Sequence, residues 1–168
     1  KMEETEIYSK AVREWGHINQ LCILVEECNE LVTQELKIVR GGWNKEVITL
    51  LIGEAVDTQI TLHQAKLIFF RAIPGFRESV GKVPREECIK CAEGTDVMNP
   101  EVLCDLIHAV LKYRRGLRSE MDVIREISKV QTHLNQLRGW VGREADWKET
   151  KERKLMRLER KIKYNGGL

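Results

Sequence analysis

The chain has 168 residues, of which 32% are charged, and its formal net charge is +2. This near balance of charge argues neither for nor against a nucleic-acid partner, and the length accommodates one or two small domains. The longest apolar run, 47–52, is too short to cross a bilayer and no secretory leader is evident, so we expect a cytoplasmic protein that does not enter a membrane.

The prolines and glycines divide the chain into long helices. All three prolines, at 74, 84 and 100, lie in the middle of the sequence, which leaves both flanks free to form helices. Glycines at 41, 42 and 116 and in the segment 139–142 are typical helix stops. No segment shows the alternation of a strand. We therefore predict an all-α protein with helices over about 3–15, 18–39, 45–70, 100–115, 120–138 and 144–163.

Five carboxylates occur in two clusters on neighbouring predicted helices. Glu26, Glu27 and Glu30 lie on the second helix, and Glu54 and Asp57 lie on the third. Spacings of three and four place each set on one side of its helix, so two antiparallel helices could direct the carboxylates into one gap. Carboxylate oxygens are the ligands that Mg²⁺ prefers. The alternative is that these acids form ordinary solvated helix faces.

Three motifs together resemble those of a known enzyme family. They are Trp15-Gly16-x-x-x-Gln20, Glu26-Glu27-x-x-Glu30-Leu31 and Glu54-Ala55-Val56-Asp57. The combination resembles the MazG-like nucleoside triphosphate pyrophosphohydrolases, an all-α family of helical bundles related to the dimeric dUTPases and dCTPases. The resemblance covers residues 5–70. It implies hydrolysis of a (deoxy)nucleoside triphosphate to the monophosphate and pyrophosphate, with Mg²⁺ as cofactor or Mn²⁺ in its place.

The resemblance also implies roles for the acids. Glu27, Glu30, Glu54 and Asp57 are expected to hold the metal, and Glu26 is the candidate to orient or deprotonate the attacking water. The choice of base among adjacent glutamates does not follow from the sequence.

Two further groups of residues are candidates for substrate binding. Trp15 and Gln20 could hold the base by stacking and through a side-chain amide, as could His17 and Trp43, although core packing is the alternative for both tryptophans. The amphipathic segment 151–168 resembles the tail of phage-type family members, and this resemblance places Lys154, Arg157 or Lys161 near the triphosphate. A solvated helix is the alternative for that segment. The preferred base is not indicated.

An internal repeat predicts a tandem architecture. Leu36-Lys37-x-x-Arg40-Gly41 recurs as Leu111-Lys112-x-x-Arg115-Gly116, and Gln59-x-x-Leu62-x-Gln64 recurs as Gln131-x-x-Leu134-x-Gln136. In this register Glu26, Glu30 and Glu54 align with the acids Glu101, Asp105 and Glu126. Glu27 and Asp57 align with Val102 and Lys129, which are not acidic. We expect a catalytic repeat over 1–70, a connector over 71–99 and a degenerate repeat over 100–168 that ends in the amphipathic helix. Chance similarity between helical sequences is the alternative.

Because the family assembles from units of this kind, a fused repeat would form a pseudo-dimer within one chain. We therefore expect a homo-oligomer, as a dimer of pseudo-dimers.

A second set of residues has the spacing of a zinc site. Cys88-x-x-Cys91 is followed by Cys104 and His108, which matches a small zinc finger with one His replaced by Cys. A structural Zn²⁺ could fasten the connector to the second repeat. Reduced thiols and packing residues are the alternative.

Two other functions compete with the hydrolase. A non-catalytic helical module that binds nucleotides or mediates assembly would use the same scaffold. Nucleic-acid binding is less favoured, because acids are interleaved with basic runs such as 112–115.

Overall fold

The computed structural model describes residues 2–70 and 97–165, and in these ranges every regular element is a helix. The six helices are α1 (Glu4–Trp15), α2 (His17–Gly41), α3 (Lys45–Phe70), α4 (Pro100–Arg114), α5 (Glu120–Val141) and α6 (Glu144–Asn165). The prediction of an all-α protein is confirmed, and each helix lies close to its expected range.

The largest difference from the expected ranges occurs at the end of α5. We expected the helix to end at 138, yet it continues through Gly139 to Val141 and stops within the predicted segment 139–142, with Gly142 in the left-handed region at a φ of 63°. Glycine adopts that conformation without the steric cost of a Cβ, so the second glycine ends the helix. Ser119 starts α5 through a capping box with Asp122.

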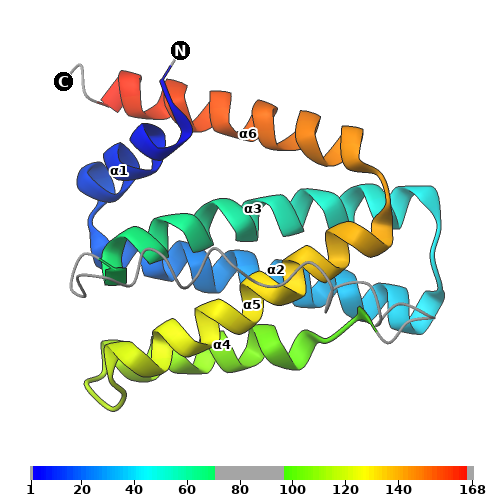
Figure 1. Cartoon of the computed structure of the whole chain (residues 1–168), viewed down its shortest axis with the longest axis horizontal. Coiled ribbons are helices and arrows are strands. Elements are labelled where there is room, and N and C mark those ends of the chain that lie inside the picture. Colours follow the sequence, from blue (N-terminus) through cyan, green and yellow to red (C-terminus); the bar gives the residue numbers. More distant parts are fainter. Residues whose placement is uncertain (1, 71–96, 166–168) are drawn as a thin grey trace.

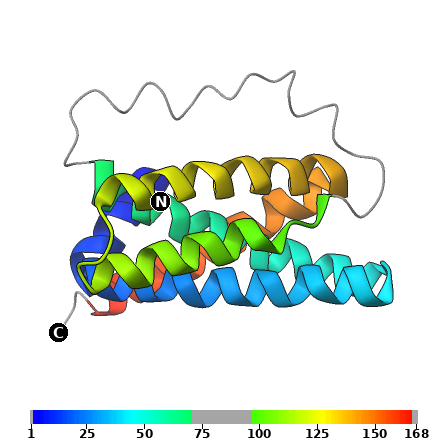
Figure 2. The ribbon, with the colours of Figure 1, turned by 90° about the horizontal axis from the view of Figure 1, so that it is seen from below.

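Two helical hairpins form the body of the molecule (Figure 1). One hairpin consists of α2 and α3 and the other of α4 and α5; α2 packs against α4, and α3 packs against α5. Figure 2 shows α2 and α4 side by side along most of the length of α4. This arrangement leaves one side of α3 available to α1 and α6, both of which pack on it.

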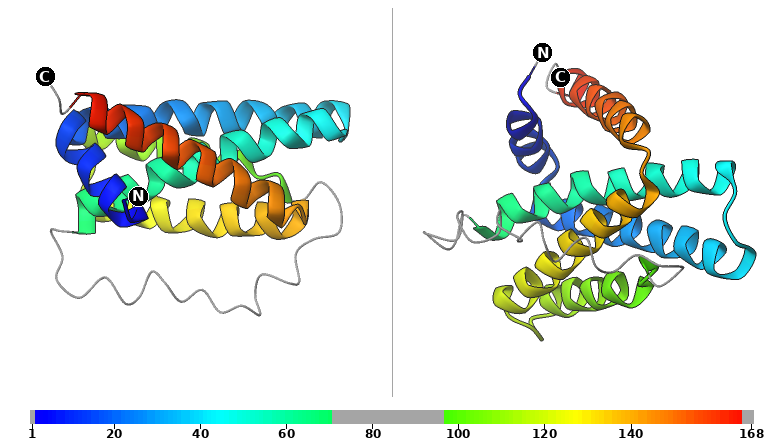
Figure 3. Two further views of the ribbon diagram at one scale, coloured as in Figure 1. Left: turned by 90° about the horizontal axis from the view of Figure 1, so that it is seen from above. Right: turned by 45° about the vertical axis from the view of Figure 1, so that its right-hand side comes forward.

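The terminal helices α1 and α6 lie next to each other at the same side of the molecule (Figure 3). A small apolar cluster of Ile7, Ala11 and Ile162 joins them. Two polar contacts add to it: Lys151 Nζ lies 2.6 Å from Glu4 Oε1, and the Met2 backbone N–H donates to Glu159 at 3.2 Å. The last helix in the sequence is therefore held beside the first.

One hydrophobic core extends through α2, α3, α4 and α5 and includes Tyr8 of α1 and Trp147 of α6. Within it, His133 of α5 and Glu35 of α2 form a buried contact with 2.5 Å between Nε2 and Oε1. Helices from both sides of the segment 71–99 thus share this core. The three-part division of the chain and the origin of the hairpins by duplication stay predictions. None of the helices in the described ranges combines the length and apolar character needed to cross a membrane.

Candidate active site

The α2–α3 hairpin brings together acids that lie far apart in the sequence. The Thr58 hydroxyl of α3 donates to the backbone carbonyl of Glu27 at 3.2 Å, which fixes the level of one helix against the other. At this level, carboxylate oxygens of Glu27, Glu30 and Glu54 all lie within 4.8 Å of one another. In the part of the chain that the structure describes, no second cluster of this kind occurs. Three of the four expected metal ligands therefore meet.

The cluster carries more negative charge than its surroundings accommodate easily. Burial, followed by repulsion from Asp57, Glu30 and Glu54, raises the pKa of Glu27 to about 7. Burial and a hydrogen bond with Glu30 likewise raise the pKa of Glu54 to about 7. Such shifts are typical of carboxylates that lack a compensating cation.

Asp57, the fourth expected ligand, is half-buried one turn beyond Glu54 on α3 and is engaged differently. Its carboxylate forms an ion pair with Lys154 of α6. It lies close enough to Glu27 and Glu54 to raise the pKa of both, whereas Lys154 lowers both. The ammonium of Lys154 thus supplies part of the positive charge that the cluster attracts.

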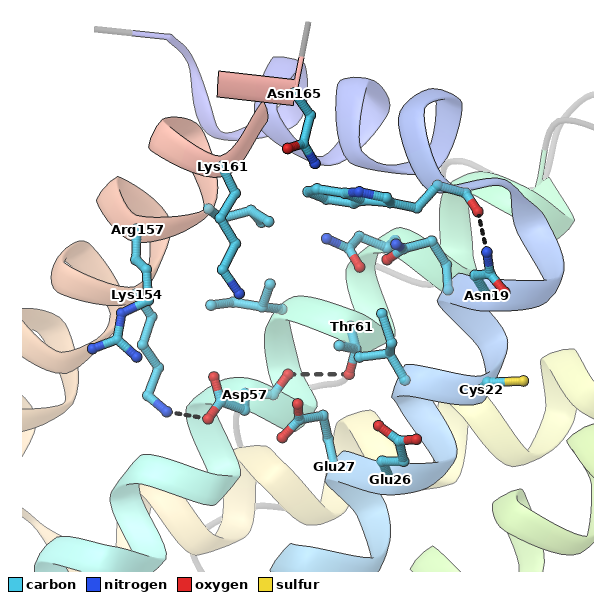
Figure 4. Close-up of a pocket in the computed structure, with 16 residues that line it drawn as sticks. Asn19, Cys22, Glu26, Glu27, Asp57, Thr61, Lys154, Arg157, Lys161 and Asn165 are labelled. Carbon is cyan, nitrogen blue, oxygen red and sulfur yellow. Dashed lines mark hydrogen bonds and ion pairs between the residues drawn. The ribbon is translucent and has the colours of Figure 1, made fainter. Parts of the chain in front are cut away.

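A pocket of about 680 Å³ opens beside these acids, between α1, α2, α3 and α6 (Figure 4). Its acidic side is formed by Glu26, Glu27 and Asp57, and α6 faces it with Lys154, Arg157 and Lys161. The remaining lining residues are Trp15, Asn19, Gln20, Cys22, Ile23, Ile60, Thr61, Gln64, Leu158 and Asn165. Carboxylates and cations therefore face each other across a space that accommodates a small molecule.

All four of the expected substrate-binding residues, Trp15, Gln20, Lys154 and Arg157, line this pocket. Glu26, the expected base, is exposed and lines it as well. Glu30 and Glu54 are not among the lining residues, so Glu27 is the residue that belongs both to the acid cluster and to the pocket.

Two other candidates lie elsewhere. His17 is exposed at the start of α2 and is not part of the lining. Trp43 follows α2 and stacks on Trp140, with ring centroids 3.8 Å apart and planes 4° apart. This tryptophan therefore joins the two hairpins and does not face the pocket.

Among the side-chain amides that line the pocket, sequence reasoning missed Asn19, Gln64 and Asn165. Gln64 carried a usable signal, because it lies seven residues after Asp57 on a largely apolar helix and so shares its side. Asn165 gave no such signal in the sequence, because its position in the pocket depends on how α6 packs against the other helices.

The second half of the chain does not reproduce the acid cluster. Glu101 and Asp105 are exposed on α4, whereas Glu126 is buried on α5 and accepts a hydrogen bond from Lys129 Nζ at 3.1 Å. Lys129, which replaces an acid in the repeat register, therefore pairs with a carboxylate of its own helix.

The expected zinc ligands are only partly described. Cys88 and Cys91 lie outside the described residues, and Cys104 and His108 are exposed one turn apart on α4. The zinc site stays a prediction.

Comparison of the chain with protein-family models, curated proteins and solved structures found no match.

Proposed function

We propose that this chain is a Mg²⁺-dependent nucleoside triphosphate pyrophosphohydrolase that acts on the cytoplasmic nucleotide pool. The observation that carries the proposal is the opposition, across one pocket, of an acidic wall and a row of cations on α6. Acids of this kind suit a divalent cation, and Lys and Arg suit phosphate oxygens. The resemblance of residues 5–70 to the MazG-like family supports the same reaction.

The residues of the acid cluster fit a hard cation. Oxygens of Glu27, Glu30 and Glu54 lie within 4.8 Å of one another, and the raised pKa values of Glu27 and Glu54 reflect charge that a cation would neutralise. These three residues would hold the metal, and Asp57 would join them after its carboxylate is released from Lys154. Bound Mg²⁺ supplies neutralisation of phosphate charge and acidification of water.

The cations of α6 bind and orient the triphosphate. Lys154, Arg157 and Lys161 are three and four residues apart, which places them on one side of the helix, facing the acids. Their charge balances the negative charge of the phosphoryl oxygens in the transition state. A water oxygen attacks the α-phosphorus. The bond between the α-phosphorus and the oxygen that bridges it to the β-phosphate breaks, and pyrophosphate leaves with that oxygen. Glu26, which is exposed and lines the pocket, accepts the proton of the water.

The decisive experiment measures pyrophosphate release from a panel of NTPs and dNTPs with Mg²⁺ and Mn²⁺. We expect metal-dependent release from at least one nucleotide, and loss of at least about a hundredfold in kcat/KM in Glu27→Gln and Asp57→Asn, with unchanged helicity by circular dichroism. Glu101→Gln and Asp105→Asn are matched controls, since they change the exposed acids of α4 that align with Glu26 and Glu30 in the repeat. We expect both variants to retain full activity.

The outcomes separate the competing functions. Binding of nucleotides by calorimetry without release of pyrophosphate would identify a non-catalytic nucleotide-binding module. Equal activity in the parent, Glu27→Gln and Asp57→Asn would show that the acid cluster does not perform the reaction.

The proposal includes self-association. Leu36, Val39 and Leu50 are each about half exposed in the α2–α3 hairpin, which favours contact with another copy. Light scattering tests this part, and a strict monomer at assay concentration would contradict it.

A further inference from the structure

Two buried glutamines line the pocket, one from each helix of the α2–α3 hairpin. Gln20 of α2 and Gln64 of α3 both line it, and each is only 2% exposed. The contact between the Thr58 hydroxyl and the Glu27 carbonyl sets the level of the antiparallel helices. Gln20 precedes Glu27 by seven residues and Gln64 follows Thr58 by six, so the two amides lie at nearly the same level.

Both glutamines leave a polar atom without a partner. Among the described residues, Gln20 Nε2 and Gln64 Oε1 are inaccessible to solvent and make no hydrogen bond. Buried amide groups are nearly always hydrogen-bonded, so two orphaned amides on the wall of one pocket indicate a ligand with complementary groups. One atom is a donor and the other an acceptor, which means that the ligand offers both an acceptor and a donor.

An aromatic side chain and the distance from the acids narrow the chemistry of that ligand. Trp15 lines the pocket, and its backbone carbonyl accepts a hydrogen bond from Asn19 Nδ2 at 2.8 Å, which ties it to the start of α2. Seven residues along a helix span about 10 Å, so the amides lie about that far from Glu27 and Asp57. A planar ring at this end would reach the acids through a sugar and the first phosphates.

We propose that Gln20 and Gln64 read the edge of the nucleobase and thereby determine which base the enzyme accepts. Because neither orphaned atom is accessible to solvent in this structure, each amide would turn toward the ligand. The Gln20 amide N–H would then donate to a ring or exocyclic acceptor, the Gln64 carbonyl would accept from a base N–H, and Trp15 would supply the surface on which the base stacks. This inference rests on the proposed function, because it assigns the specificity of the same site.

The test uses Gln20→Met and Gln64→Met in the full chain, with Gln34→Met as the matched control. Gln34 is also a buried glutamine of α2 with an orphaned Oε1, yet it does not line the pocket. Affinity for nucleoside monophosphates is measured by calorimetry without metal, and kcat/KM is measured across the nucleotide panel with Mg²⁺. The first measurement does not depend on hydrolysis.

We expect the two pocket variants to weaken binding of the preferred monophosphate about tenfold or more, and to reduce the kcat/KM ratio between best and worst bases by a similar factor. Gln34→Met should change neither quantity. Because Met has a similar volume and removes an orphaned polar atom, the Tm of both pocket variants should equal or exceed that of the parent. A merely structural glutamine would lower the Tm and leave base preference unchanged.

A ligand-side deletion identifies the direct contact. With a monophosphate whose base lacks the N–H group that Gln64 is proposed to bind, Gln64→Met should cost no further affinity, since the donor is already missing. The inference is overturned if the parent binds no monophosphate, or if both pocket variants match Gln34→Met in affinity and base preference. Pyrophosphate release with an unchanged base preference would overturn this inference and leave the proposed function standing. Binding that depends on the glutamines without hydrolysis would support this inference and contradict the reaction.

Discussion

Lys154 of α6 forms an ion pair with Asp57 of α3. The C-terminal helix therefore contributes a positive charge next to the acid cluster. The same Lys154 lowers the pKa of Glu27 and Glu54, in opposition to their acidic neighbours. Lys154 also lines the pocket, so under the proposed function its ammonium group would compete with a divalent cation for Asp57.

Removal of this competition should strengthen metal binding. In Lys154→Met, without nucleotide, we expect the affinity for Mn²⁺ measured by calorimetry to rise about tenfold, since a neighbouring positive charge is lost and Asp57 is released. The KM for a nucleotide should rise at the same time, because we propose that Lys154 also binds the phosphates. Lys148→Met, which changes an exposed lysine of α6 outside the pocket lining, is the control. Unchanged or weaker Mn²⁺ binding in Lys154→Met would contradict the competition.

Neutralisation of one cluster acid should stabilise the metal-free protein. Glu54 lies half-buried among Glu27, Glu30 and Asp57, so Glu54→Gln removes a desolvated like charge. At about pH 8 with a chelator, we expect the free energy of unfolding to rise by about 1 kcal/mol. Mn²⁺ should raise the Tm of the parent and have little effect on this variant, because the proposed set of metal ligands is complete only in the parent. Glu46→Gln, at an exposed position of α3, provides the comparison. A lower Tm of Glu54→Gln in chelator would show that the carboxylate is stabilising without metal.

The partly buried His63 should make the fold sensitive to acid. Burial lowers the pKa of His63 from 6.5 to about 4, and the charges of Lys66 and Lys151 act in the same direction, against Glu4. Tyr8 covers the imidazole edge-on at 5.6 Å. Between about pH 6.5 and pH 4, His63 is therefore protonated in the unfolded chain and neutral in the folded chain. The stability contribution is complete above the unfolded pKa of 6.5 and is lost as the pH falls toward 4.

Denaturant unfolding of the parent and His63→Gln at several pH values tests this dependence. The parent should lose about 2 to 3 kcal/mol more than the variant between about pH 7 and pH 4. The comparison with the variant removes the contribution of Glu4, whose own pKa is lowered by Lys151 and Tyr8 despite burial. His17→Gln, at an exposed residue, should follow the parent. Parallel curves for the parent and His63→Gln would contradict the role of the imidazole.

Trp147 should be the main anchor of α6. It is 2% exposed, its indole N–H donates to Gln59 at 3.3 Å, and the Arg138 guanidinium lies 5.8 Å from its ring centroid. We expect Trp147→Ala to cost about 3 to 5 kcal/mol and to accelerate hydrogen exchange throughout α6. Trp43→Ala, which removes a half-exposed ring stacked on Trp140, should cost about 1 kcal/mol. Unchanged protection of α6 in Trp147→Ala would place its anchor elsewhere.

The helices and part of the site were predictable because they depend on local sequence. Prolines, glycines and apolar periodicity act within a few residues, and they located the six helices. Spacings of three and four placed the acids of each helix on one side, so that Glu27, Glu30 and Glu54 were predicted as neighbours before any packing was known. The end of α5 was the exception, because either Gly139 or Gly142 could have stopped the helix and backbone conformation decided between them.

Contacts between distant segments were not available from these local rules. The pairing of Lys154 with Asp57 joins residues 97 positions apart in the chain, and its geometry depends on how α6 packs on α3. Gln64 of α3 lines the pocket together with residues of three other helices, so its place there depends on how those helices pack. The orphaned amide atoms could not be inferred at all, since an absent partner is visible only when every neighbour is in place.

The sequence by itself determined the helical class of the protein and the acidic character of one helical hairpin, because helix formation and side-chain spacing are set by nearby residues. Only the tertiary structure decided that α1 and α6 form a pocket beside those acids, that Lys154 pairs with Asp57, and that one amide atom of Gln20 and one of Gln64 are buried without a hydrogen-bond partner. The physical reason is that burial, pKa shifts and unmet hydrogen bonds arise from contacts between segments, which the packing of the helices creates.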